Sequence, residues 1–132
     1  MALLEKMKFY APMSVRYGVG IVFLLFGISQ ITDPSSWLGY LPVGISNYIV
    51  PTTFILFNGV FDLTLGILLL LGLFTRIVSA IAVLHLLGIL ATLGYNEVSI
   101  RDFGLMLGAL SVFLNGPDMW CVDRKVFRRY RD

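Results

Sequence analysis

Two ionisable side chains stand inside long apolar stretches of the sequence, where a charge is costly. Asp62 lies in the apolar segment 52–74, and His85, the one histidine of the chain, lies in the segment 77–95. An ionisable residue in a membrane-spanning segment usually faces other helices and is a candidate functional residue. Imidazole titrates near neutral pH, and a buried carboxyl group is either protonated or paired. Such a pair could exchange protons or bind a small ligand.

The depths of the two residues predict that they touch. Asp62 lies about ten residues from the outer end of its segment, and His85 about eight from the inner end of the next, so at ~1.5 Å per residue both lie near the middle of the bilayer. Asn58, one helical turn from Asp62, could donate a hydrogen bond to it. Two interpretations stay open: a proton-handling or ligand-binding pair, and a structural hydrogen bond that fixes the register of two helices.

A second group of polar residues is expected near the outer edge of the hydrocarbon. The segment 98–115 has only about 12 uninterrupted apolar residues, or ~18 Å of helix, so it must draw Arg101 and Asp102 to that edge. Gln30, at the outer end of the first segment, is expected at a similar depth. These residues either form a polar mouth or act as an interfacial anchor and a helix N-cap. Arg16, at the inner end of the first segment, is expected to reach the inner interface as an anchor.

The composition places these residues in an integral membrane protein. Of the 132 residues, 58% are hydrophobic and 14% charged, whereas soluble domains average about 45–50% and 25%. This composition excludes a water-soluble globule, a disordered chain and a nucleic-acid binder. One cysteine and one histidine exclude an intrachain disulfide framework, a multi-cysteine metal site and a haem with two histidine ligands.

Crossing ~30 Å of hydrocarbon takes roughly 20 mainly apolar residues. The sequence predicts an all-α membrane protein, a single domain over 1–132 that forms a compact antiparallel bundle of four transmembrane helices. The predicted spans are about 14–31, 52–74, 77–95 and 98–115. Stripes of small residues, at spacings that alternate between three and four, allow the helices to pack closely. The GxxxG of Gly104 and Gly108 serves either this packing or a contact between subunits in a homo-oligomer.

The distribution of basic residues predicts the orientation. Nine of the ten Lys and Arg residues fall on one side of the four spans, so both termini are expected in the cytoplasm of a protein of the cell membrane. The outer loop 33–51, with Trp37, Tyr40 and Tyr48, is expected to lie on the bilayer surface as a lid.

The two ends of the chain are also expected to meet the membrane surface. The cytoplasmic tail 118–132 alternates Trp120, Val126, Phe127 and Tyr130 with basic residues, among them Arg131. It is either an amphipathic helix on the anionic inner leaflet or a basic anchor without a partner. Residues 1–11 could form a similar short interfacial helix. Cys121 is expected to be incidental.

Three motifs resemble the DoxX/DoxD-like family of small four-helix membrane proteins, over roughly residues 15–117. Arg16-Tyr17-Gly18 opens a Gly-rich first helix, an acidic residue in the second helix precedes the run Leu70–Arg76, and Ile100-Arg101-Asp102 opens the fourth. The resemblance implies a multi-pass membrane protein and carries functional roles over to Arg16, Asp62, Arg101 and Asp102. The family often has Glu at the acidic position, so Asp62 is a shorter variant. Some relatives are linked to quinone-coupled oxidation of sulfur compounds beside a redox subunit, and others to oxidative-stress complexes or to maturation of other proteins.

Two functions follow as expectations. The first is a quinone- or small-ligand-binding membrane subunit of a redox system, with a polar intramembrane site that handles protons. The alternative is a non-enzymatic accessory, scaffold or chaperone-like subunit of another membrane protein or complex. We identify no self-contained catalytic motif, metal site or covalent cofactor site in the sequence, and a quinone is the candidate ligand. The candidate residues for ligand binding or proton handling are Asp62, His85, Asn58, Arg101, Asp102, Gln30 and Arg16.

Overall fold

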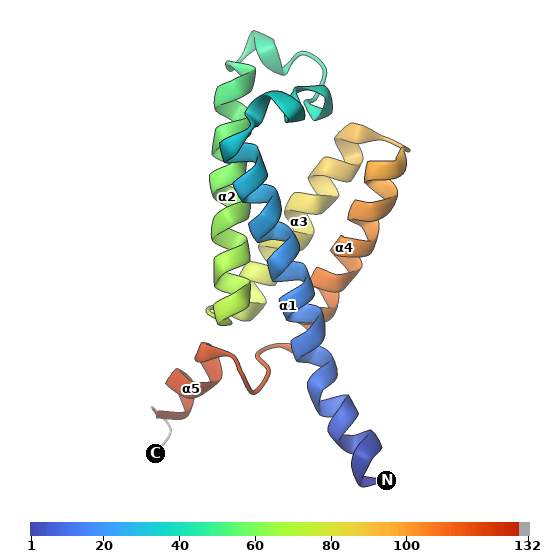
Figure 1. The fold of residues 1–132 in the computed structure, drawn as a ribbon, viewed down its shortest axis with the longest axis vertical. Helices are drawn as coiled ribbons and strands as arrows, with labels where there is room; N and C mark the ends of the chain where they lie inside the picture. The colour runs from blue at the N-terminus through green and yellow to red at the C-terminus, as the bar shows by residue number, and fades with distance from the viewer. Residues whose placement is uncertain (130–132) are drawn as a thin grey trace.

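A computed structural model describes residues 1–129, and its elements are all helices. Four helices run up and down: α1 (Ala2–Thr32), α2 (Pro51–Leu71), α3 (Thr75–Leu93) and α4 (Glu97–Asn115). The 3-10 helices η1 (Pro34–Tyr40) and η2 (Ile45–Asn47) lie between α1 and α2, and α5 (Val122–Arg129) follows α4. We call the end with η1 and η2 the loop end, and the opposite end, where α5 and the N-terminus lie, the tail end (Figure 1).

The helical class that the sequence predicts is confirmed. Among the described residues, α1, α2 and α3 are long and apolar enough to cross a membrane. Helix α4 has 19 residues, as α3 does, but Glu97, Arg101 and Asp102 fall in its first two turns. These charges explain why α4 is less apolar than the other three helices.

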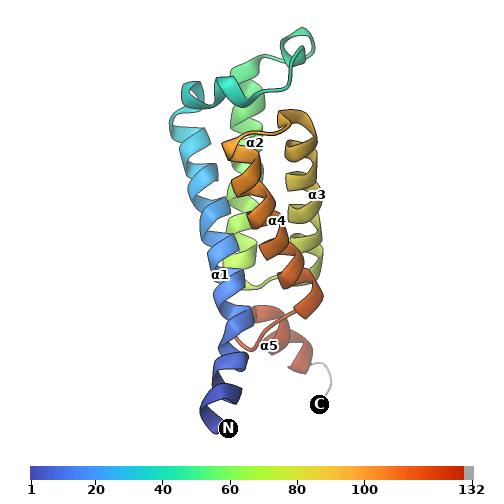
Figure 2. The same ribbon diagram turned by 90° about the vertical axis from the view of Figure 1, so that its right-hand side faces the viewer.

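The first helix differs from the prediction. Residues 1–11 do not form a separate helix, because α1 runs without a break from Ala2 through Pro12 to Thr32. Ala, Leu, Met, Glu and Lys in this stretch are strong helix formers, and a proline removes only a local hydrogen bond. Residues 1–11 are exposed and project beyond the bundle at the tail end (Figure 2).

The second helix ends earlier than predicted, at Leu71, because Gly72 takes the left-handed conformation that terminates helices, with φ of 71°. In the short turn that follows, Phe74 is the non-glycine residue with positive φ within residues 1–129. Helix α3 begins directly after it.

Helices α1 and α2 touch through glycines, as the stripes of small residues predict. A Cβ atom on Gly27 would lie 2.5 Å from the backbone nitrogen of Leu63, and one on Gly66 would lie 2.5 Å from that of Leu24. Contacts this short leave no room for any side chain, so the two backbones lie against each other. In the GxxxG of α4, Gly108 faces Val19 of α1, whereas Gly104 faces open space.

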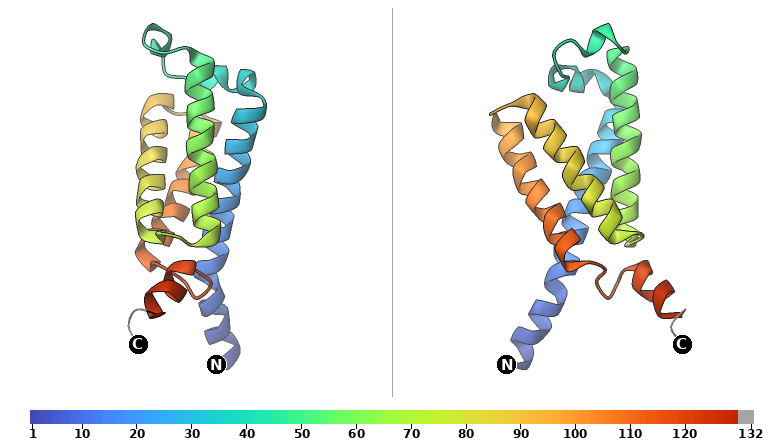
Figure 3. Two further views of the ribbon diagram at one scale, coloured as in Figure 1. Left: turned by 90° about the vertical axis from the view of Figure 1, so that its left-hand side faces the viewer. Right: turned by 180° about the vertical axis from the view of Figure 1, so that it is seen from behind.

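The apolar core lies between the pair α1–α2 and the pair α3–α4, nearer the tail end. It contains Val19, Phe23, Leu65, Leu69, Val78, Ala82, Leu86, Ala109 and Val112. Toward the loop end, α3 and α4 lean away from α1 and α2, as Figures 1 and 3 show from opposite sides. The apolar core therefore fills the middle of the bundle toward the tail end, and the helices separate toward the loop end.

Replacing Gly66 by alanine should destabilise the bundle by roughly 1–3 kcal/mol, because the added methyl group meets the backbone of α1, which cannot move aside locally. Gly18→Ala is the matched control, since a Cβ there meets nothing within 4 Å, and it should be neutral or slightly stabilising. Unfolding in mixed micelles with increasing denaturing detergent measures both. Equal stability of the two variants would contradict this account of the α1–α2 contact.

Candidate functional site

A cavity of about 350 Å³ lies in the loop half of the bundle, between the four long helices and η1. Most of its lining is apolar or aromatic. Six of the seven candidate residues from the sequence line it: Gln30, Asn58, Asp62, His85, Arg101 and Asp102. The structure thus brings together side chains from all four helices.

The predicted contact between Asp62 and His85 is confirmed. His85 Nε2 lies 3.0 Å from Asp62 Oδ1, and the two side chains are 18% and 5% exposed. The ring of Phe61 packs on the imidazole, with 4.8 Å between ring centroids. Equal depth on two consecutive antiparallel helices is the reason that the pair meets, as the residue counts along the sequence predict.

Two amides hold the other oxygen of Asp62. Gln30 Nε2 donates a hydrogen bond of 2.8 Å to Asp62 Oδ2, and Asn58 Nδ2 donates to Gln30 Oε1 at 2.8 Å and to Asp62 Oδ2 at 3.3 Å. Gln30 is predicted to lie with Arg101 and Asp102, but its hydrogen bonds go to α2. The close approach of α1 and α2 explains this, because a Cβ on Gly59 would lie 2.9 Å from that of Gln30.

The atoms that face each other in the Asp62–His85 pair are incompletely satisfied. Asp62 Oδ1 and His85 Nε2 are, among residues 1–129, the buried side-chain polar atoms without a hydrogen bond of good direction. Their separation suits a hydrogen bond but their geometry does not. A buried polar atom without such a bond costs about 1–3 kcal/mol. Because both residues line the cavity, a ligand placed there could satisfy both atoms.

Arg101 and Asp102 lie where α4 reaches the loop end. Arg101 Nε is 3.3 Å from Asp102 Oδ1, with the Arg101 side chain 53% exposed and that of Asp102 6%. The Arg101 guanidinium also lies 4.8 Å from the centroid of the Phe26 ring, which is a favourable cation–π distance. The arginine therefore stands at the edge of the cavity and the aspartate within its wall.

Aromatic side chains of η1 lie over part of the loop end of the cavity. Trp37 and Tyr40 of η1 both line it. Trp37 Nε1 donates a hydrogen bond of 3.1 Å to Ser29 Oγ, and its ring packs edge-on against Phe26 at 5.6 Å. Tyr48, which the sequence groups with these residues, is 90% exposed. Of the loop that the sequence predicts to act as a lid, it is the first half, with Trp37 and Tyr40, that lines the cavity.

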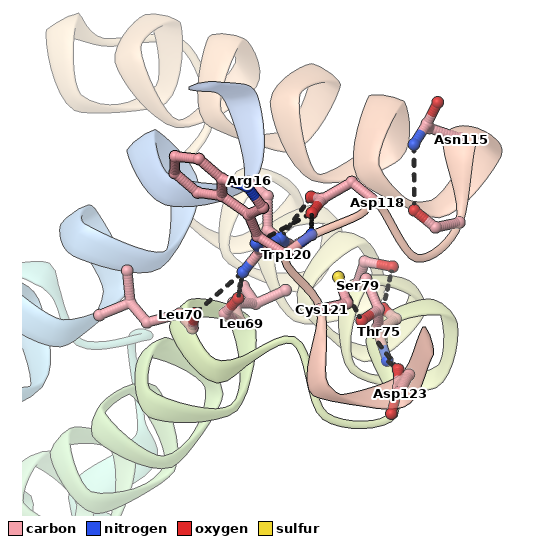
Figure 4. Close-up of polar contacts among 11 residues, drawn as sticks. Arg16, Leu69, Leu70, Thr75, Ser79, Asn115, Asp118, Trp120, Cys121 and Asp123 are labelled. Carbon is pink, nitrogen blue, oxygen red and sulfur yellow. Dashed lines mark hydrogen bonds and ion pairs between the residues drawn. The ribbon is translucent and has the colours of Figure 1, made fainter. Parts of the chain in front are cut away.

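Arg16 lies at the tail end and does not line the cavity. The expectation that it reaches the interface as an anchor is wrong, since it is only 1% exposed. Its Nε and Nη2 bond to the two carboxylate oxygens of Asp118 at 2.6 and 3.1 Å. Its Nη1 donates to the carbonyls of Leu69 and Leu70 at 2.6 and 2.9 Å (Figure 4). The guanidinium is therefore neutralised by a carboxylate and caps the end of α2.

Sequence reasoning missed the tail residues that close this end. The carboxylate of Asp123 accepts hydrogen bonds of 2.7 Å from the backbone nitrogens of both Phe74 and Thr75, and so caps α3 from a distant part of the chain. Cys121 is fully buried against Gly72, and this burial raises the pKa of its thiol. Capping across some 50 residues has no local sequence signature. The predicted tail forms helix α5, while Tyr130 and Arg131 lie outside the described residues.

Asp118→Asn should destabilise the protein by roughly 3 kcal/mol or more, because it leaves the buried Arg16 charge without its partner. Burial opposes ionisation of Asp118, but hydrogen bonds from Arg16 and from the Trp120 backbone outweigh it and hold the pKa below the ordinary 3.8. The stabilisation by the Arg16–Asp118 ion pair is therefore complete above pH 3.8. It is lost as the pH falls through the lowered pKa of Asp118. Unfolding measured against pH should show this acid loss in the wild type and not in the variant; the same acid profile in both would contradict it.

Comparison with known proteins identifies the family. The model of the DoxX family matches residues 11–94, which contain α2, α3, nearly all of the buried part of α1, and the Asp62–His85 pair. The uncharacterized membrane protein Rv3486 of Mycobacterium tuberculosis is 31% identical over 135 residues, covering 87% of this chain and 80% of that protein. No solved structure matches the chain. With three helices apolar enough to span a membrane, the chain is a multi-pass membrane protein that belongs to the DoxX family.

Proposed function

We propose that the protein is the quinone- or small-ligand-binding membrane subunit of a redox system, and that the cavity of the loop half is its binding site. One observation carries this proposal. Asp62 Oδ1 and His85 Nε2 are buried, line an apolar cavity and lack well-directed hydrogen bonds. A ligand oxygen in the cavity beside the pair, within reach of both atoms, would accept a hydrogen bond from one group and, once protonated, donate to the other.

The lining of the cavity favours a flat lipophilic ring with polar oxygens. Phe23, Phe26, Phe54, Trp37 and Tyr40 supply aromatic surface on which a ring can stack. The polar residues contact only part of the ligand and so fix its orientation. A volume of about 350 Å³ lies at the lower end of the usual range for small-molecule sites, ~300–1,000 Å³. A quinone headgroup combines these properties.

The chain's own residues would bind the ring and supply protons. Reduction of a quinone to a quinol takes up two electrons and two protons, and oxidation releases them. The Asp62–His85 pair would hold one proton at a time and reload between the two transfers, while a redox partner protein exchanges the electrons. Gln30 and Asn58 would keep the Asp62 carboxylate oriented, because both bond to its other oxygen.

The proposal includes a membrane arrangement with four spans. Helix α4 equals α3 in length and packs against both α3 and α1, which supports a fourth crossing. The tail-end part of α1 contains Lys6 and Lys8, Arg76 stands where α3 begins at the tail end, and α5 carries further basic residues, whereas Arg101 stands in the loop-end part of α4. The positive-inside rule then places both termini in the cytoplasm and the η1–η2 loop on the outer surface.

Titration with a short-chain ubiquinone should quench the fluorescence of Trp37 in lipid nanodiscs in a saturable manner, because Trp37 lines the cavity. Trp120 lies at the tail end, where its ring packs against Tyr10 and Tyr17. Trp120→Phe should therefore keep the saturable component and Trp37→Phe should remove it. Quinone that merely dissolves in the bilayer would quench both tryptophans without saturation.

Asp62→Asn should weaken this binding about 10- to 100-fold, which corresponds to the loss of one hydrogen bond to a charged group, ~1.5–3 kcal/mol. Thr64→Val is the matched control, because Thr64 lies on the same helix, is exposed and bonds only to the backbone of Val60. Wild-type affinity in Asp62→Asn, or no saturable quenching in the wild type, would reject the site. A stoichiometric partner captured in mild detergent would then favour the scaffold alternative.

A further inference from the structure

The Asp62–His85 pair shares its cavity with two polar residues of α4 at the loop end. Asp102 and Arg101 line the same cavity as the pair. Asp102 is only 4% exposed, and its side chain forms part of the wall of this cavity. Its neighbour Arg101, at 53% exposure, reaches the surface. A proton could therefore move from the surface to Asp102 and on to the pair through water in the cavity.

Toward the tail end, apolar packing closes the path from the Asp62–His85 pair. From Asp62 to Leu69, helix α2 runs about seven residues, or ~10 Å, and the one polar side chain in this stretch, Thr64, is exposed. Phe23 and Leu86 form the floor of the cavity and belong to the core. At this level α1 and α2 are in backbone contact at Gly66, which leaves no space for water between these two helices.

The next polar groups toward the tail end are already engaged. Arg16 is bonded to Asp118 and to two carbonyls. Ser79 donates to the carbonyls of Thr75 and Arg76. Neither group is free to pass a proton toward His85, and apolar core residues lie between.

We propose that Asp102 relays protons between the Asp62–His85 pair and the aqueous phase at the loop end, so that the pair exchanges protons with that side of the membrane alone. The titratable and charged groups that line the cavity are Asp62 on α2, His85 on α3, Arg101 and Asp102 on α4, and Tyr40 on η1; α1 contributes the neutral Gln30. The inference rests on the proposed function for the role of the pair. It adds the side from which redox chemistry at this site takes up protons.

Because His85 is the one histidine of the chain, its signals show with which side of the membrane the pair exchanges protons. Protein labelled with ¹⁵N-histidine is reconstituted into liposomes and sorted for one orientation through a tag on the tail, and the pH on each side is set independently with impermeant buffers. The ¹⁵N signals of His85 should respond to a change of pH at the loop end and not to one at the tail end. Signals that follow the tail-end pH, or both sides equally, would overturn the proposal.

The relay residue is tested by proton exchange at the His85 ring in the same labelled protein. Asp102→Asn should slow the exchange at least tenfold, whereas Asp102→Glu, which restores a carboxyl group, should recover it. Glu97→Gln, which removes an exposed acid of α4 outside the cavity lining, is the matched control and should match the wild type. Unchanged exchange in Asp102→Asn would remove Asp102 from the route. Neither experiment contains quinone, so the absence of quinone binding would reject the proposed function without changing these outcomes.

Discussion

The backbone contact between α1 and α2 is the constraint on which the candidate site depends. Gly27 and Gly66 each stand where a single added carbon would collide with the neighbouring helix. At this separation Gln30 reaches the Asp62 carboxylate and Asn58 reaches Gln30. A wider spacing would leave three polar side chains without partners in an apolar environment, where each lost hydrogen bond is costly.

The tail end of the bundle holds the helices together and does not form the candidate site. Arg16 ties α1 to the end of α2 and to the segment after α4, and Asp123 ties that segment to the start of α3. These bonds hold the four helices together at the tail end. Helices α3 and α4 can therefore lean away from α1 and α2 at the loop end while the bundle stays intact. Closure at the tail end and an open cavity at the loop end are thus parts of one arrangement.

Depth along a helix can be predicted from the sequence, and this is why the meeting of Asp62 and His85 could be predicted. The apolar segments, the helical class and the family resemblance follow equally from local composition and motifs. Rotation and separation of helices depend on the partner, and so the hydrogen bonds of Gln30 and the burial of Arg16 could not be read from residue counts. The caps formed by Asp118 and Asp123 join residues far apart in the chain and leave no periodic pattern.

Because Cys121 is buried, the reactivity of its thiol reports how often the structure around it opens. The thiol is the only one in the chain and is 0% exposed, where the tail segment packs against Gly72. A thiol-specific reagent can reach it only when that segment detaches from Gly72. The rate of alkylation therefore measures how often the tail segment detaches from Gly72, on the same free-energy scale as hydrogen exchange, with no engineered label.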